Sequence, residues 1–507
     1  MLLILRESFE VAVSERSEWR HAPCAISFRL VFLVTAVVIG ATVACDAHVG
    51  VLLLAITGGC SLLVAIVCWP IASLFAFLAI VGLSRYDPFS FTFRFTDKID
   101  FWGWWWRYKF LGLVSPIDLL LGVFVGTVGL AQLSRGRLVK KPFDPFMAAL
   151  SLVALVAAVL GAVGHAEQDV WKDWLFQVRG LAFICGMYFV VSRLPWSERK
   201  VVLLLWYLVA LALVVLALGF LEMMRTPPEL RIIKYGKPLL KRDNADGIFS
   251  LFLTFLPIIV LLEGPRLRRL YKLALVVFFG YQLFNLSTSV FTTRTIIVFG
   301  TLVYLGWHYR LHRRREWMIS GVAVLVLVLA VAFSQVLMGL ASPKHWVARS
   351  PLRVIRADNL SVATRVMEMQ NVFANLVNRL ALLQGLGLGR KWYEFYPQPN
   401  DPGAWPPEEQ GARWHLGVHV PILDMLLMFG LMGTTTVLGL LLRTVLFYRK
   451  ILLEMTNWQI RVMGQIALLL GVITFIFDLN VPKVNIYTGV MWGILGAIAP
   501  LLTQRKG

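Results

Sequence analysis

Acidic residues are scarce in this chain, and charged residues of either sign are few. Only 15% of the 507 residues are charged, with 29 Asp and Glu against 49 Lys and Arg. A soluble globular domain has about 25% charged and about 45–50% apolar residues, whereas 58% of this chain is hydrophobic and its mean hydropathy is +0.72. This composition excludes a water-soluble fold as the main organisation of the chain.

Residues for metal and redox chemistry are also sparse. The five cysteines are scattered and no two form a Cys-x-x-Cys pair, which favours small apolar side chains over a disulfide or a metal site. The sequence contains no His-Glu-x-x-His motif and no Asp-rich motif of the sort used in metal-dependent sugar transfer. We therefore expect no metal and no cofactor.

Apolar runs of about 20 residues recur along the chain, and they are continuous rather than alternating, which indicates membrane helices and not strands. We predict an all-α polytopic membrane protein with about 14 membrane helices (roughly 12–14). The predicted spans are 32–45, 51–67, 70–84, 114–133, 145–164, 174–192, 200–221, 247–262, 273–288, 290–307, 317–339, a helix opening at 419, 462–479 and 486–503.

The short loops between these spans are basic, and alternation of the spans puts them on one side. These loops are 135–141, 193–200, 266–272, 310–315, 449–450 and 505–506. Lys and Arg collect in cytoplasmic loops, so we expect this side and both termini to be cytoplasmic. The expected layout is a cytoplasmic segment 1–28, membrane helices over 29–340, an outer loop 341–418 with short helices, and membrane helices with a cytoplasmic tail over 419–507.

The net charge of +20 would suggest nucleic acid for a soluble protein. Here the basic loops account for much of it, and no nucleic-acid partner is expected. The predicted outer loop 223–246 is an exception, because it carries six Lys and Arg against three acids. Two interpretations remain open: a site for a polyanionic ligand such as a phosphate, or a solvated loop that touches lipid headgroups.

Two further residues have both a structural and a functional interpretation. Arg294 lies in the apolar run 290–303, where a central charge costs a few kcal/mol. It either snorkels or pairs across helices, or it binds a phosphate. His419 opens a predicted span and is either a cap or interface residue, or a base for proton removal near neutral pH. Asp424 is five residues further on, beyond the spacing that pairs two side chains on one helix face.

Glycines cluster in two places. The run Gly385-Leu-Gly-Leu-Gly389 has no preceding strand and no following Lys-Ser/Thr, so a nucleotide-binding loop is disfavoured. We interpret it as a flexible turn that joins two outer helices. Gly430 and Gly433 are interpreted as close-packing positions between helices.

Taken together, these residues resemble the carboxy-terminal signature of the bacterial O-antigen ligase/polymerase family. That signature has an Arg in an outer helix, a Gly-x-Gly turn about twenty residues later, a His at the head of a span, and Gly eleven and fourteen positions beyond the His. The matching residues are Arg365, Gly385-Leu-Gly387, His419, Gly430 and Gly433.

Upstream, the segments Thr292-Thr-Arg294 and Arg242-Asp-Asn244 resemble further family features, so the resemblance covers about 240–440. The sequence departs from the family at Val420-Pro421, where members usually have Asn directly after the His.

The resemblance implies a C-type glycosyltransferase fold with one large outer loop, in the bacterial cytoplasmic membrane. It implies an inverting, metal-independent enzyme whose donor is a glycan on undecaprenyl pyrophosphate. Arg242 and Arg294 would bind the pyrophosphate and stabilise the charge that builds on the leaving group, with Arg294 counted among the catalytic residues. His419 would act as general base or would orient the acceptor hydroxyl, and Arg365 would hold the donor or the outer segment.

The number of spans and the long outer loops favour a polymerase of repeat units. A ligase that moves a finished glycan to a lipid or protein acceptor is the first alternative, and a transporter or flippase of lipid-linked oligosaccharide is the second. Expected partners are the lipid-linked donor, an acceptor glycan or lipid, membrane lipid, and other polysaccharide assembly proteins.

Overall fold

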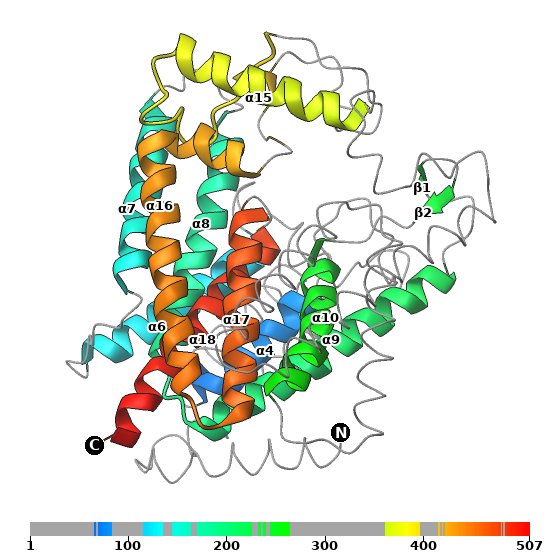
Figure 1. Ribbon diagram of the computed structural model, residues 1–507, viewed down its shortest axis with the longest axis vertical. Helices are drawn as coiled ribbons and strands as arrows, with labels where there is room; N and C mark the ends of the chain where they lie inside the picture. The colour runs from blue at the N-terminus through cyan, green and yellow to red at the C-terminus, as the bar shows by residue number, and fades with distance from the viewer. Residues whose placement is uncertain are drawn as a thin grey trace, which may run out of the picture.

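Helices dominate the computed structural model (Figure 1). It describes residues 65–66, 69–83, 115–134, 144–163, 170–225, 232–234, 237–239, 244–263, 360–395, 414–415, 418, 421–477, 479 and 482–506. The helices are α4 (Pro70–Leu83), α6 (Pro116–Ser134), α7 (Asp144–Val163), α8 (Val170–Arg193), α9 (Glu198–Arg225), α10 (Asn244–Glu263), α15 (Leu360–Asn378), α16 (Pro421–Glu454), α17 (Trp458–Phe477) and α18 (Pro482–Lys506).

In the described part of the chain, four short strands form two antiparallel pairs outside the helices. Strand β1 (Ile232–Lys234) pairs with β2 (Lys237–Leu239) within the basic loop 223–246. Strand β3 (Trp392–Tyr393) pairs with β4 (Trp414–His415), so that Trp392 faces His415 in the register. Both pairs lie in segments that the sequence predicts to be extramembrane.

Six helices among the described residues are long and apolar enough to cross a membrane. These are parts of α6, α7, α8, α16, α17 and α18. The prediction of a helical polytopic membrane protein is confirmed to this extent. The first predicted span and the three predicted between 273 and 339 lie outside the described residues, and the total of about 14 stays a prediction.

Helices α18 and α8 pack closely at the centre of the bundle. Glycines on α18 make this approach feasible, since a Cβ on Gly489 would lie 2.5 Å from the carbonyl oxygen of Ile184 and one on Gly493 would lie 2.6 Å from Cβ of Val191. The glycines are four residues apart, a spacing that brings helix backbones together in membranes. Of the membrane-spanning window of α18, 94% is buried, whereas α7 exposes a stripe of large apolar side chains that includes Leu155 and Val159.

The helix ends gather at two ends of the bundle. At one end, Nε2 of Gln132 donates to the carbonyl of Arg193 at 3.1 Å, Nδ2 of Asn457 donates to Glu198 at 3.3 Å, and Arg461 pairs with Glu263 at 3.1 Å. We call this the basic end, because the predicted basic loops after α6, α8 and α10 begin there. The prediction of a loop at 449–450 is wrong, because Arg449 and Lys450 lie in the last turns of α16 at this end. Figure 1 shows the C-terminal end of α18 on the same side and α15 across the opposite end.

Candidate functional site

The candidate site is built around the segment that follows α15, residues 380–391, which we call the glycine loop. Helix α15 ends in a Schellman motif: the amide of Ala381 donates to the carbonyl of Leu376 at 2.7 Å, and that of Leu380 donates to Val377 at 3.0 Å. Leu380 takes the left-handed conformation at φ 52°, a position where glycine is usual. The chain then turns back beneath α15.

Asn375 fixes the far end of the glycine loop to α15. Its Nδ2 donates to the carbonyl of Tyr393 at 2.6 Å, and its Oδ1 accepts from the amide of Tyr393 at 2.8 Å. Strand β3 is thereby held against α15, and β4 pairs with β3 only four residues before His419. The chain just before His419 is thus attached, through the β3–β4 pair, to α15.

Helix α16 is broken at Gly430, which has φ 65° and ψ −176°. The glycine loop fills the break: the amides of Leu431 and Met432 donate to the carbonyls of Leu382 and Leu383 at 2.8 and 3.1 Å, and the amide of Leu386 donates to the carbonyl of Leu427 at 2.7 Å. Backbone groups freed in a membrane helix must find partners within the protein. Here the loop backbone supplies them, and Figure 1 shows the first part of α16 bent away from the remainder, under α15.

Two glycines of the sequence signature are in direct contact at this break. A Cβ on Gly385 would lie 2.5 Å from the amide nitrogen of Gly430, and a Cβ on Gly430 would overlap the amide nitrogen of Gly385. Both glycines have positive φ. Gly433, one turn further along α16, lies where a Cβ would meet Val153 of α7 at 3.1 Å, so the predicted helix packing at this residue is confirmed.

The glycine loop is also bonded to α7 and α8. The amide of Leu388 donates to the carbonyl of Ala157 at 2.8 Å, and the amide of Gly389 donates to Oε1 of Gln177 at 2.6 Å. A Cβ on Gly387 would overlap the backbone of Gly161. The interpretation of this run as a flexible turn between two outer helices is therefore wrong: it is a buried, hydrogen-bonded connection from α15 to β3.

A buried polar layer lies between α15 and the first part of α16. Glu368, Asn371 and Asn375 of α15 and Asp424 of α16 are all buried, with at most 2% of each residue exposed. Apolar side chains surround them in one cluster, which includes Val372 and Leu427. Polar groups enclosed by apolar packing require hydrogen-bond partners, and Asn375 has them in the carbonyl of Asn371 and the backbone of Tyr393.

Arg379 immediately precedes the glycine loop, and Arg390 lies at its far end. Burial lowers the pKa of both Arg379 and Arg390, and the charge of Arg390 lowers the pKa of Arg379 further. Lys391 follows them and pairs with Asp173 of α8 at 3.4 Å.

Of the four residues proposed for substrate contact, the structure describes only the backbone of one. Arg365 lies in α15, one turn before the buried Glu368. His419 lies outside the described residues, between Val418, which packs against the cluster under α15, and Pro421, where α16 begins. Arg242 and Arg294 also lie outside them, and their shared site stays a prediction.

Sequence reasoning missed Asn375 and Gln177, which fix the ends of the glycine loop. A signal for Asn375 was present: Glu368, Asn371 and Asn375 repeat at helical spacing on one side of α15. Among the described residues, no group of three or more His, Cys, Asp and Glu could hold a metal ion.

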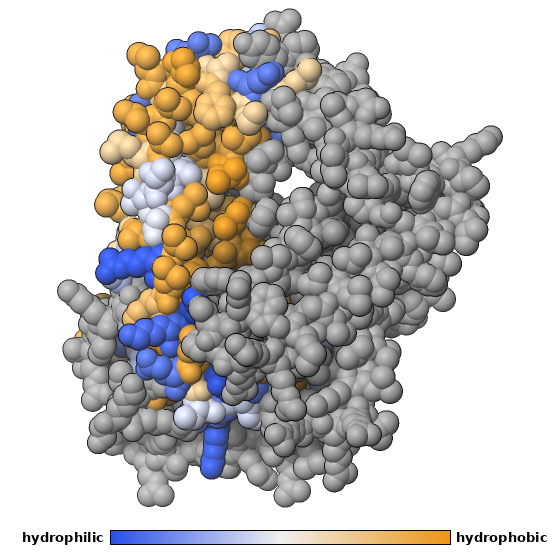
Figure 2. Space-filling view, in the orientation of Figure 1, coloured by the Kyte–Doolittle hydropathy of each residue, from blue (hydrophilic) through white to orange (hydrophobic). Residues whose placement is uncertain are grey.

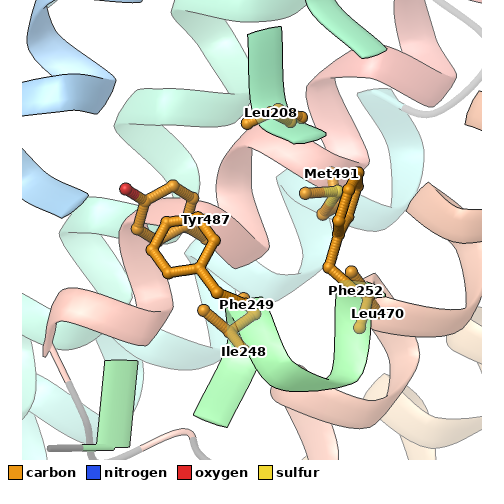
Figure 3. Close-up of a pocket in the computed structure, with 7 residues that line it drawn as sticks. All are labelled: Leu208, Ile248, Phe249, Phe252, Leu470, Tyr487 and Met491. Carbon is orange, nitrogen blue, oxygen red and sulfur yellow. The ribbon is translucent and has the colours of Figure 1, made fainter. Parts of the chain in front are cut away.

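A small cavity elsewhere in the bundle is unrelated to this site. It lies among Leu208 of α9, three residues of α10, Leu470 of α17, and Tyr487 and Met491 of α18 (Figure 3). Its volume of about 10 Å³ is that of one water-sized sphere. The cavity therefore has room for about one water molecule and is too small for a sugar or a lipid.

The fold and site define a helical membrane protein in which the segment between α15 and β3 is fitted into a broken helix. The sequence matches no protein-family model and no curated protein.

Proposed function

We propose that this chain is a membrane glycosyltransferase of the O-antigen ligase/polymerase type. It transfers or polymerises a glycan carried on undecaprenyl pyrophosphate at the outer face of the bacterial cytoplasmic membrane, for surface polysaccharide synthesis. The proposal includes a C-type glycosyltransferase fold, about 14 spans and inverting transfer without a metal.

The contact between Gly385 and Gly430 is the observation that carries this proposal. These residues are 45 positions apart in the sequence, yet neither has room for a Cβ because of the other's backbone. The resemblance groups them in one signature with Arg365 and His419. Residues that share a signature through function or structure are expected to meet in space, and these two do.

The framework around His419 supports a role in catalysis. Catalytic groups need to be held within a fraction of an ångström of the productive geometry. The β3–β4 pair and the cluster containing Val418 secure the chain just before His419, and Pro421 starts α16 just after it. Proline suits the first helical position, since its missing N–H would have no helical partner there. The departure from the family at Val420-Pro421 is consistent with a helix that begins at this residue.

In the proposed reaction, His419 takes the proton from an acceptor hydroxyl as its oxygen attacks the anomeric carbon of the donor sugar. The bond from that carbon to the pyrophosphate oxygen breaks, and the lipid pyrophosphate leaves. Arg242 and Arg294 bind the pyrophosphate and stabilise the charge that develops on it. Arg365 holds the outer segment or the donor.

Polymerisation of repeat units remains the preferred form of this reaction, with ligation to a lipid or protein acceptor as the alternative. A flippase is the competing class, and the break in α16 favours it in one respect, because transporters use discontinuous helices at their binding sites. In this chain the backbone groups at the break are bonded to the glycine loop. Such a filled break is more suited to holding a fixed site than to opening and closing.

The test uses purified protein in liposomes with undecaprenyl-pyrophosphate oligosaccharide, with and without a glycan or lipid acceptor. We expect glycan transfer by the wild type and at least a hundredfold loss in His419→Ala and Arg294→Ala. His312→Ala and Arg310→Ala, from the predicted cytoplasmic loop, are matched controls expected to retain activity. Growth of the glycan on the lipid indicates a polymerase, and transfer to another molecule a ligase.

Lipid-linked oligosaccharide that crosses the bilayer without any new glycosidic bond would establish a flippase instead. Normal glycan transfer by both Ala variants would refute the catalytic assignment.

A further inference from the structure

Helix α15 is apolar on part of its exposed surface as well as on its buried side. Its buried side combines Glu368, Asn371 and Asn375 with the apolar Val372 and Leu376. Large apolar side chains are exposed along another side and continue into the glycine loop. This outer apolar face consists of Met369, Phe373, Val377, Leu380 and Leu383. A surface helix in water places its apolar stripe toward the core, so the outer apolar face requires an apolar environment.

The length of α16 after its break indicates how deep in the membrane the outer apolar face lies. From Leu431 to Arg449, the helix after the break rises by about 27 Å at about 1.5 Å per residue. The hydrocarbon core of a bilayer is about 30 Å thick. Arg443, exposed twelve residues after Leu431, can extend its side chain toward the boundary at Arg449. With Arg449 at that boundary of the hydrocarbon, Leu431 lies near the other.

Backbone hydrogen bonds bring the outer apolar face to the same level. The amides of Leu431 and Met432 donate to the carbonyls of Leu382 and Leu383. Met432 is 64% exposed and Leu383 is 57% exposed, so the two surfaces adjoin. The outer apolar face therefore continues the lipid-facing surface of the membrane helices. Figure 2 shows mainly hydrophobic residues from the end that carries α15 down to about the middle of this side of the molecule, with hydrophilic residues below.

Leu380 gives a second indication. It is 88% exposed and adopts a left-handed conformation at φ 52°, which costs a leucine roughly 1 kcal/mol relative to glycine. The cost of the conformation is the same in water and in lipid, but the exposure of the side chain is unfavourable only in water. Contact with lipid therefore explains why an exposed leucine occupies a position where glycine is usual.

Two arginines near the outer apolar face carry the charge that would bind the phosphate groups of lipids. Arg379 directly precedes Leu380 at the end of α15, and Arg390 follows Gly389, whose amide is bonded to Gln177 near the start of α8. Both cations therefore lie at the α15 end of the bundle, where an anion would stabilise them. Lipid phosphates lie at the boundary of the hydrocarbon, and amphipathic helices that lie in this region combine apolar side chains with Lys and Arg.

We propose that α15 is an interfacial helix of the same membrane that holds the spans. The outer apolar face lies among the acyl chains of the adjacent leaflet, and Arg379 and Arg390 bind the phosphate groups of its lipids. The glycine loop thereby joins the membrane surface to the break in α16. This inference is independent of the proposed enzymatic function.

Spin labels on α15 test the contact with lipid. In a variant with all five native cysteines replaced by Ala, nitroxides are attached at Met369→Cys and Phe373→Cys, with Asn378→Cys as the matched control. Asn378 is exposed on the same helix but on a different side. In liposomes of phosphatidylcholine and phosphatidylglycerol, we expect labels at 369 and 373 to be accessible to oxygen and protected from a water-soluble nickel chelate, and the label at 378 to show the opposite.

Two results would overturn the lipid contact. Equal accessibility of all three labels to the nickel chelate would mean that the outer apolar face lies in water. Protection of 369 and 373 from both reagents would mean that a second copy of the chain, or another protein, covers it.

A separate measurement tests the two arginines. Phosphatidylglycerol added to the detergent-solubilised wild type should raise its melting temperature, and the Arg379→Ala/Arg390→Ala variant should lose at least half of that shift. The Arg379→Lys/Arg390→Lys variant keeps both charges and should retain most of it. An equal shift from inorganic phosphate at the same concentration, or an unchanged lipid-induced shift in the double Ala variant, would contradict headgroup binding.

Discussion

At the scale of single residues, the break in α16 depends on two glycines that exclude each other's side chains. A Cβ on Gly430 would overlap the amide nitrogen of Gly385 and the carbonyl oxygen of Leu383. Both glycines also have positive φ, where an L side chain is strained. The backbones of the glycine loop and of α16 can hydrogen-bond to each other only because neither glycine carries a side chain.

Gly385→Ala and Gly430→Ala should each destabilise the protein by about 2–4 kcal/mol, since backbone must move as well as take a strained conformation. The measurement is thermal unfolding in detergent, where each variant should melt several degrees below the wild type. Gly439→Ala is the matched control, because Gly439 lies in the same helix with nothing within 4 Å of an added Cβ. It should leave the melting temperature unchanged or raise it slightly.

If Gly430→Ala melts like Gly439→Ala, the break in α16 does not require the contact with the glycine loop.

The sequence predicted that Gly430 and Gly433 are packing positions, but it did not predict the partner of Gly430. Spacing along one helix indicates which residues share a face. It contains no information on which distant segment approaches that face, and Gly385 is 45 residues earlier. The same limit applies to Gln177, whose contact with Gly389 joins segments 212 residues apart.

At the scale of elements, α6 and α8 are joined by an ion pair inside the bundle. Arg179 of α8 approaches Asp118 of α6 at 2.6 Å and donates to Oγ of Ser115 at 2.7 Å. Asp118 also accepts from the amide and the hydroxyl of Ser115, both at 2.6 Å. One carboxylate therefore caps the start of α6 and neutralises a cation of the neighbouring helix.

Asp118→Asn should destabilise the protein by about 2–3 kcal/mol, because it leaves the mostly buried guanidinium of Arg179 without its counter-charge. Thermal unfolding in detergent measures the effect. The comparison variant is Asp173→Asn, whose partner Lys391 lies at 3.4 Å with 41% of its side chain exposed. Since exposed ion pairs contribute little, Asp173→Asn should cost less than about 1 kcal/mol.

The double variant Asp118→Asn/Arg179→Gln supplies the check on this explanation. Removing both charges should recover part of the stability lost in Asp118→Asn. A double variant that loses the full sum of the two single effects would contradict a coupled pair.

Hydropathy predicted most helix positions but not the break in α16. The predicted span at 114–133 corresponds to α6 at Pro116–Ser134, and that at 462–479 to α17 at Trp458–Phe477. In α16, the residues on both sides of Gly430 are apolar, so hydropathy predicts one continuous span there. Apolar composition reports burial in lipid or protein, whereas a break depends on hydrogen-bond partners that another segment provides.

At the scale of the whole molecule, the two ends of the bundle are built from different elements. The basic end joins helix termini through Gln132, Asn457 and Arg461. The opposite end carries α15, the glycine loop and the bend of α16. An enzyme that acts on an outer-face glycan needs the second end outside the cytoplasm, and the charge of the predicted basic loops favours that orientation.

Cysteine labelling in intact cells tests this orientation. Single cysteines are placed in a cysteine-free variant at Asn378 near the end of α15, and at Ser197 and Thr456 in the α8–α9 and α16–α17 connections of the basic end. A membrane-impermeant maleimide should label Asn378→Cys in intact spheroplasts. It should label Ser197→Cys and Thr456→Cys only after the membrane is permeabilised, because Lys- and Arg-rich loops are retained in the cytoplasm. The reverse pattern would place α15 and the glycine loop in the cytoplasm, where no outer-face glycan could reach them. A mixed pattern, with Ser197→Cys and Thr456→Cys on opposite sides, would contradict the shared basic end on which the topology depends.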